Sequence, residues 1–147
     1  MMQLQQVDHI ALICSDYERS KAFYTEVLGC TVVQEQYRAE RDSWKCDLAL
    51  NGRYLLELFS FPKPPPRPSS PEACGLRHLA FQVADLDAAI SDLMARGIAV
   101  EPVRHDETRN GARFTFFKDP DGLPLELCEA AVDYTAAHTE RLQGGRA

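Results

Sequence analysis

The sequence lacks the features that would place the protein in a membrane, in the secretory pathway or on nucleic acid. No apolar run approaches the roughly 20 residues that a membrane-spanning helix needs. No basic cluster occurs, and the net charge of −6 argues against a nucleic-acid surface. Residues 1–6 contain neither a basic segment nor an apolar one, so we expect no signal peptide.

Cysteine is present, but it follows no pairing pattern. The five cysteines are scattered and odd in number, and no Cys-x-x-Cys motif occurs. This usage is typical of reduced thiols in a cytoplasmic protein rather than of a disulfide framework. The 147 residues, 45% of them hydrophobic, suffice for one compact domain or for two small fused modules.

A repeated spacing of histidine and glutamate is the most informative feature that is present. His9 and Glu57 lie 48 positions apart, and so do His78 and Glu126, 69 positions further along the chain. Each histidine opens an alternating apolar stretch and each glutamate closes one. The spacing therefore indicates two copies of one unit, and each copy brings one imidazole and one carboxylate to corresponding places.

The first copy predicts the element order β-α-β-β-β. Ser15 or Asp16 is expected to cap the helix, with Ala22, Phe23, Val27 and Leu28 on one helical face, and Gly29 is expected to end it. The predicted strands cover residues 6–14, 31–37, 44–50 and 53–61, and Asn51-Gly52 forms the turn between the last two.

Six prolines fall within residues 62–71, a segment too poor in backbone donors for a strand or a helix interior. The second copy then repeats the order, with a helix from the Asp85 cap to about Arg96 and Gly97 after it. We therefore predict one domain over 1–131, with module one at 6–61, a linker at 62–75, module two at 76–130 and a C-terminal tail at 132–147, either a loose helix or frayed. The predicted strands of module two are 76–83, 98–103, 113–118 and 123–129.

Buried histidine and glutamate side chains need partners, because an unpaired buried carboxylate is very costly. Four such groups can satisfy one another through a cation. Two imidazoles and two carboxylates suit Zn²⁺, Ni²⁺, Co²⁺, Mn²⁺ or Fe²⁺, and geometry chooses among these ions. The alternative interpretation is that the histidines are hydrogen-bonded core residues and the glutamates are salt-bridged at sheet edges.

The motifs resemble the vicinal oxygen chelate superfamily, and most closely its glyoxalase I (lactoylglutathione lyase) members. The resemblance extends over residues 7–129 and includes the turn Asp119-Pro120-Asp121-Gly122 that leads to Glu126. It implies an α+β fold of two tandem βαβββ modules that form a cup-shaped mixed sheet, often in a homodimer. It also implies that one divalent metal is held by His9, Glu57, His78 and Glu126.

The resemblance further implies a lyase or isomerase that acts on a small α-oxo substrate through a metal-stabilised enediolate. A metal-bound glutamate is the base in such enzymes, so Glu57 and Glu126 are the catalytic candidates, with Glu126 favoured. Glutathione-using members carry an arginine where this chain has Ile13, and an asparagine that residues 58–62 do not contain. We therefore expect a substrate other than a glutathione hemithioacetal.

Other members of the superfamily supply alternative functions. Extradiol dioxygenases hold Fe²⁺ with two histidines and one glutamate, and epimerases and fosfomycin-resistance transferases lack the glutamate matching Glu57. Bleomycin-resistance-like proteins sequester a ligand without metal. Arg38, Arg41 and Arg113 are candidates for binding an anionic substrate, and the candidates for an apolar lining are Trp44, Phe59, Phe61 and Phe116.

Overall fold

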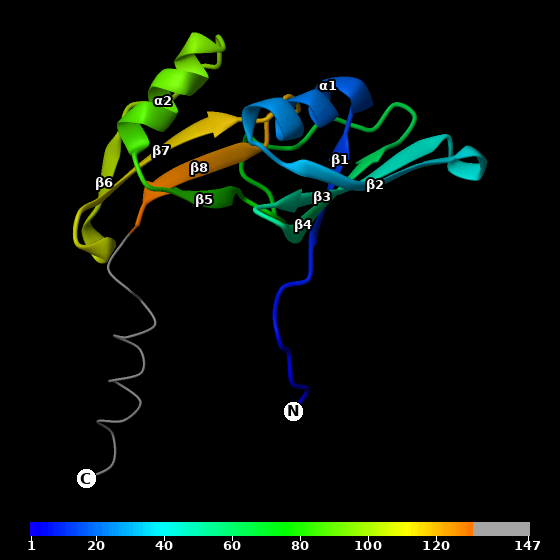
Figure 1. Cartoon of the computed structure of the whole chain (residues 1–147), viewed down its shortest axis with the longest axis horizontal. Helices are drawn as coiled ribbons and strands as arrows, with labels where there is room; N and C mark the ends of the chain where they lie inside the picture. The colour runs from blue at the N-terminus through cyan, green and yellow to red at the C-terminus, as the bar shows by residue number, and fades with distance from the viewer. Residues whose placement is uncertain (131–147) are drawn as a thin grey trace. The chain divides into compact units, whose positions relative to one another are not determined.

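The computed structural model describes residues 1–130, which divide into two compact units (Figure 1). Unit one comprises residues 1–73 and 119–123, and unit two comprises 74–118 together with the described residues from 124. Each unit has the order β-α-β-β-β and one four-stranded mixed sheet. The predicted fold class, two tandem βαβββ modules, is confirmed.

Unit one contains four strands in the order β1-β4-β3-β2, with β1 parallel to β4 and the other neighbours antiparallel. Two short helical turns, η1 and η2, follow α1 and β2. The bounds are β1 Ile10–Cys14, α1 Tyr17–Ala22, η1 Phe23–Val27, β2 Thr31–Arg38, η2 Ala39–Arg41, β3 Ser43–Leu50 and β4 Arg53–Ser60.

The helix of unit one begins where the sequence predicts and then changes its form. Asp16, one of the two predicted caps, accepts a hydrogen bond from the backbone nitrogen of Arg19 at 3.1 Å. From Phe23 the helix widens into a π-helical turn, in which the nitrogen of Leu28 donates to the Phe23 carbonyl at 3.2 Å. Gly29 ends it with a φ of 75°, a left-handed conformation that favours glycine.

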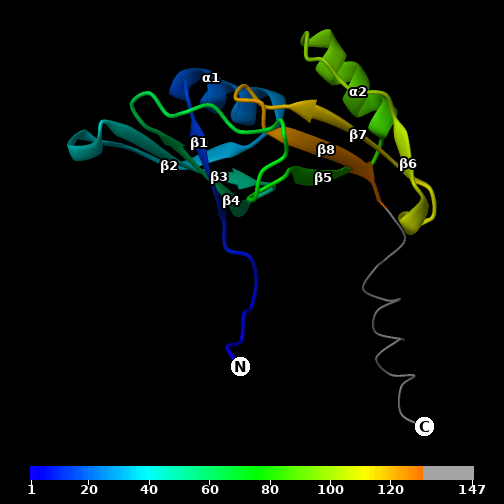
Figure 2. The same ribbon diagram turned by 180° about the vertical axis from the view of Figure 1, so that it is seen from behind.

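The two faces of this sheet differ because side chains alternate along β4. Leu56 and Leu58 are buried, as is Tyr24 of η1. The helix α1 contacts β4 and lies over one face of the sheet (Figures 1 and 2). Glu57 lies between these leucines in sequence and therefore points to the opposite face. That opposite face, which no helix of unit one covers, is the surface on which the candidate site is built.

Unit two repeats the arrangement, with the strand order β5-β8-β7-β6 and β5 parallel to β8. Asp85 caps α2 by accepting a hydrogen bond from the nitrogen of Ala88 at 2.9 Å, and Gly97 follows the helix, both as predicted. Leu86 and Leu93 of α2 are buried in the core with Leu125. The bounds are β5 Leu79–Val83, α2 Leu86–Ala95, β6 Arg104–Asp106, η3 Glu107–Arg109, β7 Ala112–Lys118 and β8 Pro124–Glu129.

Some predicted boundaries are wrong. Residues 98–103 form no strand, and the short β6 begins at Arg104 instead. Pro102 has no backbone N–H to donate to a ladder, which explains why the apolar stretch does not pair throughout. The strands β1 and β5 begin at Ile10 and Leu79, so His9 and His78 each stand immediately before a strand rather than inside one.

The proline-rich segment contains neither a helix nor a strand, as predicted. Its contacts place residues up to 73 with unit one. The predicted tail at 132–147 lies outside the described residues. No helix within residues 1–130 is long and apolar enough to span a membrane.

The cysteines give a prediction about thiol reactivity. All five are free, and only Cys74 is exposed. Burial raises the pKa of Cys14 to about 11 and also raises the pKa values of Cys30 and Cys46. A chromogenic disulfide reagent at pH 8 is therefore expected to titrate one thiol rapidly in the native protein, and Cys74→Ser is expected to remove that fast phase. A fast phase that persists in the variant would contradict the assignment.

Candidate metal centre

The first His–Glu pair, His9 and Glu57, is assembled by the parallel pairing of β1 with β4. Ala11 lies opposite Glu57 in this register, and strand alternation puts His9 on the same face. The Nε2 atom of His9 lies 3.3 Å from Oε2 of Glu57. The two predicted ligands of the first copy are therefore brought together.

Asp8 orients the imidazole of this pair. Its Oδ2 accepts a hydrogen bond from Nδ1 of His9 at 2.7 Å. This bond raises the pKa of His9, against partial burial, which lowers it. With the proton on Nδ1, the Nε2 lone pair faces Glu57 and is available to a metal.

Lys45 and Tyr54 hold the carboxylate of Glu57. The Nζ atom of Lys45 lies 2.9 Å from Oε1 of Glu57 and 2.7 Å from Oδ1 of Asp47. Partial burial would raise the pKa of Glu57, but the hydrogen bonds from Lys45 and Tyr54 outweigh it and the pKa is lowered. Glu57 is therefore ionised at neutral pH and fixed on both oxygens.

The second His–Glu pair, His78 and Glu126, is built in the same way in unit two. Ala80 of β5 lies opposite Glu126 of β8, and Nε2 of His78 lies 3.1 Å from Oε2 of Glu126. The ring of Phe116 stands edge-on to His78 with 5.2 Å between the centroids. Among the described residues, His78 is the only side chain that pairs with Glu126. The second carboxylate is thus less constrained than the first.

The spacing within each pair fits two ligands of one divalent ion. Ligands about 2.1 Å from an ion stand about 3.0 Å apart at octahedral edges and about 3.4 Å apart at tetrahedral edges. The observed nitrogen-to-oxygen separations are 3.3 Å in the first pair and 3.1 Å in the second. Within residues 1–130 no three His, Cys, Asp or Glu side chains gather into a metal-binding group. Each unit accordingly contributes a pair of candidate ligands.

The other candidate residues divide into those near the Glu57 face and those committed elsewhere. Arg113 forms ion pairs with Asp87 and Glu129 at 3.1 and 2.5 Å, so its charge is already neutralised. Trp44 stacks on Tyr17 of α1, with 5.1 Å between centroids, on the face away from Glu57. Arg41 is exposed in η2. The aromatic candidates on the faces of the two pairs are Phe59, Phe61 and Phe116.

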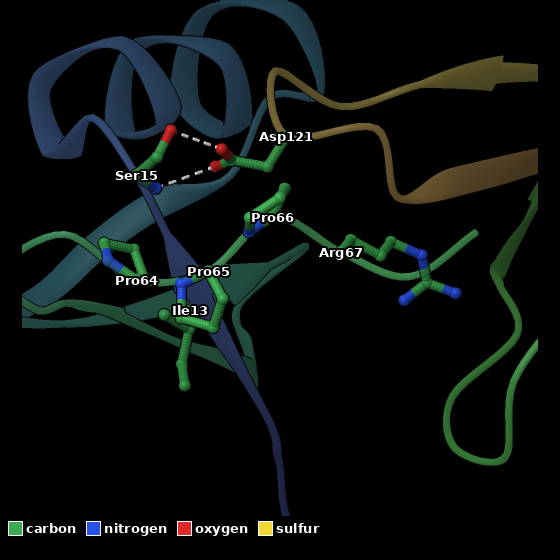
Figure 3. Close-up of a pocket in the computed structure, with 7 residues that line it drawn as sticks. All are labelled: Ile13, Ser15, Pro64, Pro65, Pro66, Arg67 and Asp121. Atoms are coloured by element: carbon green, nitrogen blue, oxygen red, sulfur yellow. Dashed lines mark hydrogen bonds between the residues drawn. The ribbon is translucent and has the colours of Figure 1, made fainter. Parts of the chain in front are cut away.

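A pocket of about 390 Å³ opens beside β1 of unit one (Figure 3). Ile13, which shares the strand face of His9, is 60% exposed and forms part of its wall. Ser15 closes one side with its backbone nitrogen and hydroxyl on the carboxylate of Asp121. The other lining residues are Pro64, Pro65, Pro66 and Arg67. The proline segment predicted only as a linker therefore also forms a pocket wall.

The Asp-Pro-Asp-Gly turn has a partner that the sequence did not indicate. Asp119 accepts hydrogen bonds from the backbone nitrogens of Asp121 and Leu123 at 2.9 and 2.8 Å. Its other oxygen accepts from the hydroxyl of Tyr24 at 2.8 Å. The turn comes from the second sequence repeat but belongs to unit one.

Comparison with known proteins places these features in a family. The profile of the Glyoxalase/Bleomycin resistance protein/Dioxygenase superfamily matches residues 6–127. Uncharacterized protein YaeR of Escherichia coli is 61% identical over 129 residues, 88% of this chain and 99% of that protein. A glyoxalase family protein of Enterococcus faecalis has a solved structure that is 46% identical, with a TM-score of 0.80 over 87% of this chain and all of that one.

More distant relatives carry names that describe activities. A 2-epi-5-epi-valiolone epimerase of an Actinomyces species is 32% identical over 142 residues, 82% of this chain and 77% of that protein. The trypanothione-dependent glyoxalase I of Leishmania major is 22% identical with a TM-score of 0.66 over 96% of this chain and 94% of that one, a likeness of fold alone.

Proposed function

Because the chain belongs to the Glyoxalase/Bleomycin resistance protein/Dioxygenase superfamily, we propose that it is a metal-dependent lyase or isomerase of the glyoxalase I type for a small α-oxo substrate. The two His–Glu pairs carry the proposal, since both have the spacing of two ligands on one divalent ion. Their donors suit Zn²⁺, Ni²⁺, Co²⁺, Mn²⁺ or Fe²⁺. A cytoplasmic homodimer is part of the proposal, and sedimentation of the purified protein tests the dimer.

A cation bound by these residues would supply Lewis-acid polarisation of a substrate carbonyl. In the first pair, neighbouring residues fix the two side chains that would bind the metal. Asp8 fixes the tautomer of His9, and Lys45 keeps the carboxylate of Glu57 ionised and in place.

Glu126 is the better candidate for the base. Its Oε2 faces His78, and no lysine or tyrosine holds its other oxygen among the described residues. A carboxylate that is less fixed can turn toward a substrate carbon and take up a proton on Oε1. The asymmetry between Glu57 and Glu126 thus supports a division between a permanent ligand and a catalytic base.

The pocket beside β1 supports a substrate without a glutathione carrier. Ile13 stands where an arginine would hold a carboxylate of the tripeptide, and its apolar side chain offers that carboxylate no partner. Three prolines line the pocket with it, and Arg67 and Asp121 are the charged lining residues. We therefore propose that turnover needs no thiol. The assay is the conversion of small α-oxo aldehydes and ketones with and without glutathione.

Elemental analysis of protein purified without chelator tests the metal. A single site that uses both pairs predicts about one transition metal per chain, and alanine in either pair should remove it. Two metals per chain, each lost independently, would indicate two separate sites. No metal, and no uptake of Zn²⁺, Ni²⁺ or Fe²⁺, would leave a ligand-binding protein.

Epimerisation next to a carbonyl is the second candidate, favoured by the 32% identity to the valiolone epimerase. It needs the same proton removal by a carboxylate but returns the proton to the same carbon. Proton NMR in D₂O separates the two reactions. Deuterium at the original carbon without a change of skeleton indicates epimerisation, and deuterium accompanied by a shifted oxo group indicates isomerisation.

Glu57→Gln tests whether the first carboxylate is a ligand. The variant keeps the shape but loses the charge, so we expect metal affinity to fall about 10- to 100-fold and the preference among metals to change. Competition between Zn²⁺ and Ni²⁺, read by elemental analysis, measures both effects. Glu35→Gln is the matched control, because Glu35 pairs with Lys21 and Tyr17 away from the histidines. Equal affinity and preference in both variants would exclude a ligand role for Glu57.

A further inference from the structure

Arg38, the last residue of β2, lies across two aromatic rings on the Glu57 face. Its guanidinium carbon is 4.9 Å from the ring centroid of Phe59 and 5.9 Å from that of Phe61. These rings are stacked, with an interplanar angle of 10°. The Nη2 atom of Arg38 donates to the hydroxyl of Ser43 at 2.8 Å. The guanidinium is therefore held over the rings by one hydrogen bond and two cation–π contacts, which favours it as an anion-binding group.

The charge of Arg38 is not matched by any carboxylate of the described residues. No ion pair joins it to an acidic side chain in residues 1–130, and its Nε is buried without a hydrogen-bond partner there. Arg104 of unit two makes a useful contrast. It also lies over two rings, Phe114 and Phe116, both 5.2 Å away, but it pairs with Glu101 at 2.9 Å. A partly buried cation that lacks such a partner is suited to a ligand that brings the negative charge.

The position of Arg38 relates it to the first His–Glu pair. Phe59 follows Glu57 by two residues on the same strand face, about 7 Å along the strand. Ile13 lies opposite Phe59 in the sheet register and also lines the pocket beside β1. On the β1 side, apolar side chains thus line the way from Glu57 to the guanidinium. Lys45, which lies opposite Phe59 on the β3 side, pairs with Asp47 and Glu57.

We propose that Arg38 binds an anionic tail of the substrate, a carboxylate or a phosphate, separated from the α-oxo group by a short apolar spacer. The inference rests on the proposed function, because the oxo group is assigned to the His–Glu pairs. To that function the inference adds a substrate class, acidic α-oxo compounds. It also adds Arg38 as a residue that determines specificity.

Three probes that share an α-oxo acid head test this assignment by calorimetry. The probes are 2-oxopentanoate with an apolar tail, 2-oxoglutarate with a carboxylate tail and 2-oxo-4-phosphonobutanoate with a phosphonate tail. The wild-type protein is expected to bind at least one charged-tail probe about tenfold or more tightly than 2-oxopentanoate. The better of the two charged tails identifies the anion.

Variants test whether Arg38 itself causes the preference for a charged tail. Arg38→Met is expected to abolish the preference for a charged tail, and Arg38→Lys to keep only part of it, since lysine retains the charge without the planar fork. Arg41→Met, a loss of an exposed arginine three residues away, is expected to leave the preference unchanged. Metal content should match the wild-type level in all three variants.

Two results would overturn the assignment: no charged-tail preference in the wild-type protein, or a preference that persists in Arg38→Met. A preference lost instead in Arg41→Met would also overturn it. Failure of the proposed function is recognised separately, by a wild-type protein that holds no metal. The probes are therefore also titrated into protein treated with EDTA, where the preference still reports on Arg38.

Discussion

Alanine in place of His9 or Glu126 is expected to release the bound metal and to lower kcat/KM by about 10³-fold or more, while the fold survives. Each substitution removes one of four proposed ligands, and loss of the metal removes several kcal/mol of transition-state stabilisation. The His9 side chain is 35% exposed, so little packing is lost with it. Elemental analysis, circular dichroism and turnover of the best α-oxo compound from the screen measure the three effects.

His105→Ala is the matched control for these two substitutions. His105 is exposed in β6 and has no glutamate at the repeat spacing, so its removal should change neither the metal content nor turnover. Unfolding without metal loss would instead favour the interpretation that His9 and His78 are hydrogen-bonded core residues. In that pattern His9→Ala and Glu126→Ala would unfold the protein, and the folded wild type would contain no metal to lose.

Asp119→Ala is expected to cost about 3 kcal/mol or more of unfolding free energy, the largest stability effect that we predict. The carboxylate accepts bonds from two backbone nitrogens and from the hydroxyl of Tyr24, a fully buried residue. Each donor left without a partner in a buried place costs about 1–3 kcal/mol. For a chain of this length the loss corresponds to a fall in Tm of about 6–12 °C.

Tyr24→Phe isolates one of the three bonds and should cost less, about 1–2 kcal/mol. Asp92→Ala is the control, since the exposed ion pair of Asp92 with Arg96 in α2 contributes little. Urea denaturation of the four proteins measures the differences. If Asp119→Ala proved no less stable than Asp92→Ala, the turn would not anchor Tyr24 in solution.

The sequence predicted the parts of the site that follow from local pattern. The repeated spacing predicted that each copy brings one imidazole and one carboxylate to corresponding places. The parallel pairing of β1 with β4 and of β5 with β8, which the structure adds, puts each histidine next to its glutamate. The supports of Glu57 were not foreseen. Lys45 reaches Glu57 only through the register of β3 against β4, which a single strand pattern does not fix.

Contacts between distant segments escaped prediction for the same reason. Tyr24 and Asp119 are 95 residues apart, and nothing local to either one indicates the other. Arg38 was one of three arginines with equal claims in the sequence. What separates it from Arg41 is the pair of rings beside it, and what separates it from Arg113 is that no carboxylate of the described residues pairs with it.

The turn at residues 119–123 bears on how such a chain could have arisen. These residues lie in the second sequence repeat, yet they complete unit one through Tyr24 and Ser15. A duplication of a single module is the simplest origin for two copies with one spacing. A protein with only the first module would lack this turn, so it would need the same segment from a neighbouring copy, and such a protein is expected to assemble by exchanging it.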